Sequence, residues 1–153
     1  MTTLKTRIQD DLTASMRRRD ELTTSTLRMA LAAVMNAEVA GTEAVILTDD
    51  QVVAVLQAEG KKRAEAAEIY ANAGRVESAA KERAELAVLE AYLPAALNDD
   101  ELATLVAEEV AAAATAGNTG PKAIGLVIKA VRDRTSGAAD GSKVAAMVKA
   151  ALA

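Results

Sequence analysis

The sequence predicts an all-α protein in which an N-terminal four-helix part is followed by a small C-terminal three-helix bundle. Ala, Leu, Glu, Lys, Gln and Arg dominate the chain and have high helix propensity, whereas no stretch alternates like a half-buried strand. Hydrophobic residues make up 51% of the chain but aromatic residues only 1%. We therefore expect a core of closely packed helices without large rings.

Four helices are predicted in residues 1–95, because apolar residues recur there at helical spacing. The first ends near residues 17–20. The second starts around Leu22 and fades at Gly41, a residue suited to the left-handed end of a helix. The expected inward faces are Leu4, Ile8, Leu12 and Met16 in the first helix, and Leu27, Ala30, Leu31, Val34 and Met35 in the second.

Thr48, with Gln51 three positions later, forms a capping-box pattern at the start of the third helix, which we expect to run to residues 72–74. The fourth helix is expected over 75–93, where Pro94 follows it. Their expected inward residues are Val52, Val55, Leu56, Ala66 and Ile69, then Ala79, Leu86, Leu89 and Leu93.

A joint at residues 94–98 separates two predicted domains, 1–95 and 96–153, because a proline is followed there by a second capping box. That box, Asn98 with Glu101, starts the fifth helix. Glycine-containing turns at 117–121 and 136–141 introduce the sixth and seventh helices, with Asp140 as the expected cap of the seventh. The expected core residues are Leu102, Leu105, Val106, Val110, Ile124, Val127, Ile128, Val131, Val144, Met147, Val148 and Leu152.

The chain contains neither Cys nor His, which removes thiolate chemistry, the commonest general base and the commonest zinc ligands. It also lacks nucleotide-binding glycine motifs and a nucleophile elbow. We therefore expect no catalytic residue, no metal and no cofactor, although a pair of carboxylates in a cleft stays open as an enzyme hypothesis. A polar start and the lack of roughly 20 consecutive apolar residues predict a cytoplasmic protein without membrane contact.

A net charge of −4 argues against a general nucleic-acid binder, so any RNA contact must depend on a local patch. All charged residues in 99–117 are acidic, whereas six basic and two acidic residues follow from Lys122 onward. We expect phosphates to lie along this basic segment. DNA reading is not expected, because the exposed positions of the seventh helix are mostly Ala. The candidate phosphate-binding residues are Lys122, Lys129, Arg132, Arg134 and Lys143.

Residues 61–63 interrupt the apolar face of the third helix with three cations, and Arg83 falls on the expected inward side of the fourth. A charged side chain that faces the core costs free energy unless it is paired with an opposite charge or binds a ligand. They form either a salt-bridge layer, with Glu59, Glu82 and Glu85 as partners, or the lining of a ligand groove. We expect Lys62 and Arg63 to find carboxylates on neighbouring helices. The candidate charged layer consists of Glu59, Lys62, Arg63, Arg75 and Arg83.

The cationic cluster at 61–63, the later Tyr70 and Gly74-Arg75, and the closing Tyr92-Leu-Pro94 resemble the central signature of the GatB/YqeY family. The resemblance covers essentially the whole chain. It implies four N-terminal and three C-terminal helices, related to the tail of the B subunit of the amidotransferase that acts on misacylated Glu-tRNA or Asp-tRNA. That tail is associated with holding tRNA, while the kinase and amidase chemistry lies elsewhere.

The resemblance therefore implies a non-catalytic tRNA- or amidotransferase-associated module, to which the family term of carbon–nitrogen ligase with glutamine as amido-N-donor is attached. A helical adaptor between proteins is the alternative, so the expected partner is tRNA or a protein. The chain departs from the family pattern at Ala138, where Arg is usual, and at Ala96, where Gln is frequent. The first change removes a cation from the turn before the seventh helix.

Overall fold

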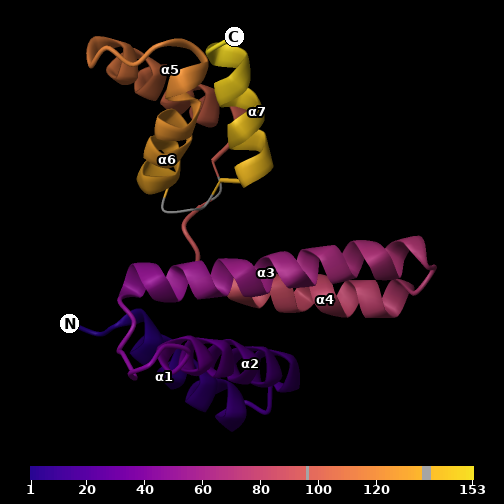
Figure 1. The fold of residues 1–153 in the computed structure, drawn as a ribbon. Coiled ribbons are helices and arrows are strands. Elements are labelled where there is room, and N and C mark those ends of the chain that lie inside the picture. Colours follow the sequence, from indigo (N-terminus) through magenta and orange to yellow (C-terminus); the bar gives the residue numbers. More distant parts are fainter. Residues whose placement is uncertain (96, 136–138) are drawn as a thin grey trace. The chain divides into compact units, whose positions relative to one another are not determined.

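The computed structural model describes residues 1–95, 97–135 and 139–153, and every regular element in these ranges is helical (Figure 1). Ala96 and residues 136–138, which include Ala138, lie outside the described residues. Seven α-helices and one short 3₁₀ helix occur in the described ranges: α1 (Leu4–Arg17), α2 (Glu21–Glu38), α3 (Asp49–Asn72), α4 (Val76–Glu90), α5 (Asp99–Thr115), η1 (Gly120–Ala123), α6 (Ile124–Thr135) and α7 (Gly141–Ala151).

The chain divides into two compact units, Met1–Leu93 with α1–α4 and Pro94–Ala153 with α5–α7. Each unit has its own cluster of buried hydrophobic residues. The independent folding of 1–95 and 96–153 as domains stays a prediction.

Local capping explains where most helices begin. The predicted capping box at α3 is present, with Thr48 and Gln51 bonded to each other's backbone N–H, and Asn98 with Glu101 forms a second at α5. Asp140 accepts hydrogen bonds from the backbone of the first turn of α7, as predicted. The expected role of Gly41 is wrong, because α2 ends at Glu38 and Gly41 has no positive φ angle.

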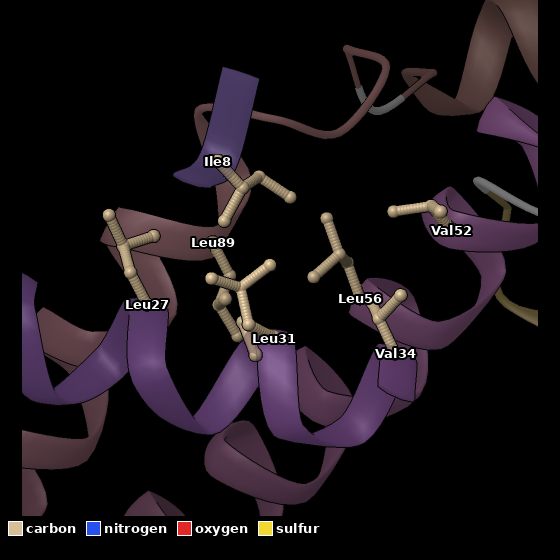
Figure 2. Close-up of a cluster of buried hydrophobic side chains, with 8 residues drawn as sticks. Ile8, Leu27, Leu31, Val34, Val52, Leu56 and Leu89 are labelled. Atoms are coloured by element: carbon tan, nitrogen blue, oxygen red, sulfur yellow. The ribbon is translucent and has the colours of Figure 1, made fainter. Parts of the chain in front are cut away.

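The core of the first unit draws side chains from all four helices (Figure 2). Gly60 on α3 lies against α4, where an added Cβ atom would sit 3.2 Å from Leu86 Cδ1. The missing side chain therefore allows these two helices to pack closely. The fully buried side chains of this core include Ile8, Leu27, Val34, Val52, Leu56 and Leu89.

Three expected core residues of the first unit are exposed: Met16 by 42%, Met35 by 56% and Ile69 by 67%. Ser15 occupies the inward position at the end of α1, where its hydroxyl shares a 2.8 Å hydrogen bond with that of Thr24. On α3 the buried face passes through Arg63 and Ala67, so Ile69 lies two residues away from it.

The second unit packs α5, α6 and α7 around a smaller apolar core. Pro121 lies near the start of η1, which leads directly into α6, so that the two form one helical run. The most deeply buried hydrophobic residues of this unit are Leu102, Val106, Ala123, Val127, Val131, Val144 and Val148.

Candidate functional site

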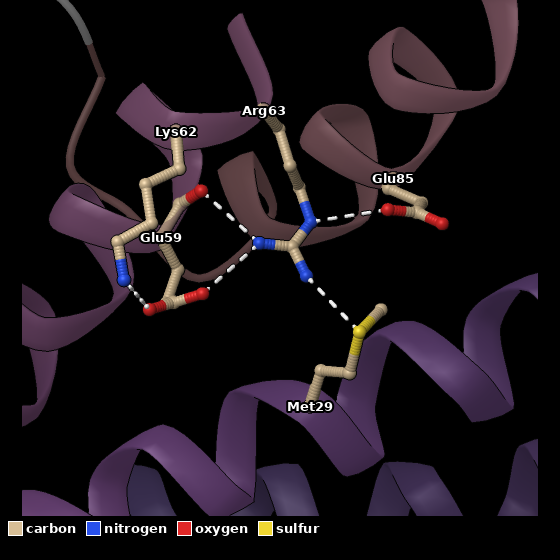
Figure 3. A network of polar contacts seen from close by, with 5 residues as sticks. All are labelled: Met29, Glu59, Lys62, Arg63 and Glu85. Atoms are coloured by element: carbon tan, nitrogen blue, oxygen red, sulfur yellow. Dashed lines mark hydrogen bonds and ion pairs between the residues drawn. The ribbon is translucent and has the colours of Figure 1, made fainter. Parts of the chain in front are cut away.

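A buried guanidinium connects α3, α4 and α2 in the first unit (Figure 3). Arg63 is only 6% exposed. Its Nε donates to Glu85 Oε2 of α4 at 3.2 Å, and its Nη1 donates to the main-chain oxygen and Oε2 of Glu59 at 3.1 and 3.2 Å. Its Nη2 lies 3.8 Å from the sulfur of Met29 on α2. Each of the three guanidinium nitrogens of Arg63 thus has a partner.

The predicted partner on a neighbouring helix is found for Arg63 but not for Lys62. The Lys62 ammonium is 71% exposed and pairs with Glu59 of its own helix at 2.8 Å. The prediction for Lys62 is therefore wrong, because only Arg63 of the three consecutive cations lies on the buried face of α3. Lys61 is exposed as well.

The other two members of the predicted charged layer lie outside this network. Arg83 is exposed, which corrects its expected inward position. Arg75 is also exposed, and its guanidinium carbon lies 5.1 Å from the centre of the Tyr70 ring. The inward acidic residue of α4 is Glu85, which is 5% exposed. Its position four residues before the buried Leu89 could have identified it.

The electrostatics of the network favour the charged form of Glu59. Partial burial acts to raise the pKa of Glu59, but the hydrogen bonds from Lys62 and Arg63 together outweigh it and hold that pKa below the usual value of 4.5. Within the described residues, no buried side-chain nitrogen or oxygen atom lacks a hydrogen-bond partner. With its partners satisfied, the cluster is suited to holding helices together rather than to transferring protons.

The predicted phosphate-binding cations of the second unit have unequal surroundings. Arg134 Nη1 donates to Glu108 Oε2 at 2.7 Å and to Glu109 Oε1 at 3.0 Å on α5, and these hydrogen bonds raise the pKa of Arg134. Lys143 pairs with Asp99, also on α5. The acidic residues of α5 thus satisfy two of the five predicted cations.

The remaining three cations share one face of the run formed by η1 and α6. Lys122, Lys129 and Arg132 are exposed and stand at helical spacing, although Lys129 also pairs with Asp133 at 3.0 Å. Gly125 lies on the same face, is exposed, and would place an added Cβ atom in open space. We call these four residues the α6 face.

A second polar surface lies at the start of α1. There a pocket of about 450 Å³ is lined by side chains that include Arg7 and Asp11. The Tyr92 hydroxyl donates to Asp11 Oδ2 at 2.5 Å, and the Arg7 guanidinium carbon lies 5.0 Å from the Tyr92 ring centre. Burial, followed by the hydrogen bond to Asp11, raises the pKa of Tyr92 well above its usual value.

In the described ranges, Asp and Glu do not gather in a group of three that could hold a metal ion. None of the helices there has the length and apolar character needed to cross a bilayer. A comparison with curated proteins gave no match. The family model described as Yqey-like protein matches residues 5–152, which is nearly the whole chain. The chain therefore belongs to the family of Yqey-like proteins.

Proposed function

We propose that this chain is a non-catalytic helical module that associates with tRNA, and that the α6 face contacts its phosphates. The observation that carries the proposal is the exposure of Lys122, Lys129 and Arg132 around Gly125 on one helical face. Each cation can release counterions from a phosphate backbone, which supplies affinity without reading sequence.

Gly125 supports the same assignment. A glycine within a helical run costs about 0.5–1 kcal/mol relative to alanine, and no neighbouring atom in the described structure requires its lack of a side chain. The open space above it lets a ligand backbone approach the helix closely between three cations. A phosphodiester chain fits both features, because it is narrow enough for the open space above Gly125 and its negative charge matches the three cations.

The resemblance to the amidotransferase tail supports tRNA as the polyanion and the amidotransferase as the protein beside which this module works. The carbon–nitrogen ligase term then describes the larger family rather than a reaction of this chain. Its function is to bind, while nucleotide and amide chemistry belong to other domains.

The test is filter retention of transcribed tRNA at 50 and 200 mM salt. The variant Lys122→Gln/Lys129→Gln/Arg132→Gln should bind more weakly, and its log–log salt slope should be shallower by about two to three, at roughly 0.7–0.9 per lost contact. The variant Gly125→Gln keeps every charge but fills the open space, and it should also weaken binding.

The matched control is Lys61→Gln/Lys81→Gln/Lys149→Gln, which removes the same charge from three exposed cations outside the α6 face. A loss of affinity equal to that of the α6-face variant would mean that net charge alone decides binding. No retention of tRNA by the wild type at 50 mM salt would refute the proposal.

A protein adaptor is the second candidate, favoured by exposed apolar side chains at the end of α2 and in the following loop. Met35, Val39, Val45 and Ile46 are 56%, 63%, 54% and 90% exposed. If tRNA does not bind, wild type and the variant Val39→Ser/Ile46→Ser should be compared in pull-downs from the native cell. A protein retained by the wild type and lost by the variant would support the adaptor.

A further inference from the structure

A second group of cations lies in the turn between α1 and α2, and its backbone is unusual. The N–H of Arg19 donates to Met16 O at 3.1 Å and that of Asp20 to Ser15 O at 3.0 Å, which closes the end of α1. Arg19 has a φ of +58°, in the left-handed region that normally favours glycine. An arginine therefore occupies a position where glycine would adopt this backbone conformation without steric cost.

Arg28 of α2 also lies near this turn. Its Nη2 lies 3.2 Å from the sulfur of Met16, a residue in the last turn of α1. Its guanidinium is thus held beside the last turn of α1, whose final residue is Arg17. We call Arg17, Arg18, Arg19 and Arg28 the arginine corner, and all four are exposed.

The nearby carboxylates offset only part of the charge of the arginine corner: hydrogen bonds from Thr23, and then the charge of Arg18, hold the pKa of Asp20 below its usual value. Asp20 accepts hydrogen bonds from the Thr23 hydroxyl at 2.7 Å and the Thr23 N–H at 3.1 Å, so it is engaged in capping α2. Glu21 is exposed at the start of α2. None of the four arginines forms an ion pair with any residue that the structure describes, in contrast to Arg134 and Lys143 of the second unit.

Helix-end electrostatics explain only part of the cluster. A cation in the last turn of a helix is favoured by the helix dipole, which accounts for Arg17. The helix dipole does not account for Arg19, whose φ angle lies in a region that is unfavourable for residues other than glycine. Nor does it account for Arg28, which belongs to α2 and not to α1. None of the four guanidiniums is paired with a carboxylate in the part of the chain that the structure describes. Each can donate two parallel N–H hydrogen bonds to two oxygens of one phosphate.

We propose that the arginine corner binds the phosphate backbone of RNA, so that the first unit carries a phosphate contact surface separate from the α6 face. The inference rests on the proposed function, because tRNA is its ligand. No aromatic side chain belongs to the corner, since both tyrosines have other neighbours: Tyr70 lies beside Arg75 and Tyr92 beside Arg7. The contact is therefore with phosphates rather than with stacked bases.

The test uses the full chain and transcribed tRNA, with binding measured by fluorescence anisotropy at 50 and 200 mM salt. The corner variant is Arg17→Gln/Arg19→Gly/Arg28→Gln, in which glycine preserves the left-handed turn and Arg18 beside Asp20 is kept. We expect its affinity to fall at least about tenfold at 50 mM salt and its log–log slope to become shallower by about two to three. Its thermal midpoint serves as the folding control, and Arg19→Gly alone should not lower it.

The outcomes separate the two proposals. If the wild type binds tRNA and the corner variant binds like the control Lys61→Gln/Lys81→Gln/Lys149→Gln, the arginine corner is not a phosphate surface, while the proposed function stands. If the wild type does not bind tRNA at 50 mM salt, both proposals fail. Binding to vesicles containing phosphatidylserine that the corner variant loses, without any binding of tRNA, would assign the corner to a membrane surface and overturn the RNA assignment.

Discussion

Replacing Arg63 by alanine should strongly destabilise the first unit. The substitution leaves Glu85, which is 5% exposed, without the guanidinium that its Oε2 contacts at 3.2 Å, and it removes one of the two cations bonded to Glu59. Removing one partner of a buried ion pair costs about 3–5 kcal/mol, because the remaining charge stays buried without compensation. Lys62→Ala, at a 71% exposed side chain, should cost no more than about 1 kcal/mol.

Urea unfolding of the two variants, followed by circular dichroism, measures this difference. The double variant Arg63→Ala/Glu85→Ala should lose less stability than the sum of the single variants, because it no longer contains the uncompensated carboxylate of Glu85. Equal costs for Arg63→Ala and Lys62→Ala would refute the assignment of the buried network as the connection between α3 and α4. So would strict additivity of the double variant.

Three further predictions concern Glu59, Tyr92 and the second unit. Because the folded-state pKa of Glu59 lies below its usual 4.5, its contribution to stability is fully present above that pH and is lost as pH falls through the folded-state pKa. Glu59→Gln should therefore flatten the acid side of the stability–pH profile measured by urea unfolding. Tyr92→Phe should cost about 1–2 kcal/mol through loss of the bond to Asp11, and Asp11→Asn serves as the paired variant. Residues 94–153 expressed alone should melt cooperatively in calorimetry, and a non-cooperative transition would contradict the predicted second domain.

The helix starts were the most predictable part of the fold. The capping boxes at Thr48 and Asn98 and the cap at Asp140 depend on residues within three positions of one another, so the local sequence contains all their partners. The helix ends were less predictable. Gly41 looked suitable for ending α2, yet the helix stops at Glu38 and its loop returns through the bond from Val45 N–H to Glu38 O.

The inward faces of the helices were predicted only in part. Leu27, Leu56 and Leu89 lie in the core, whereas Met16, Met35 and Ile69 do not. Periodicity gives the approximate direction of an apolar stripe but not which of two neighbouring positions, such as Ser15 and Met16, faces the other helices. Met16 and Ile69 therefore lie beside the buried faces of their helices, which pass through Ser15 in α1 and Ala67 in α3.

The sequence by itself determined the helical class, the capped helix starts and the family to which the chain belongs, because these follow from neighbouring residues and their order. The tertiary structure decided which charges are paired. Arg63 is buried against Glu85 while the adjacent Lys62 points to solvent, and the acidic α5 satisfies Arg134 while leaving Arg132 exposed. A side chain's partners depend on which helices pack beside it, and residues distant in sequence set that packing.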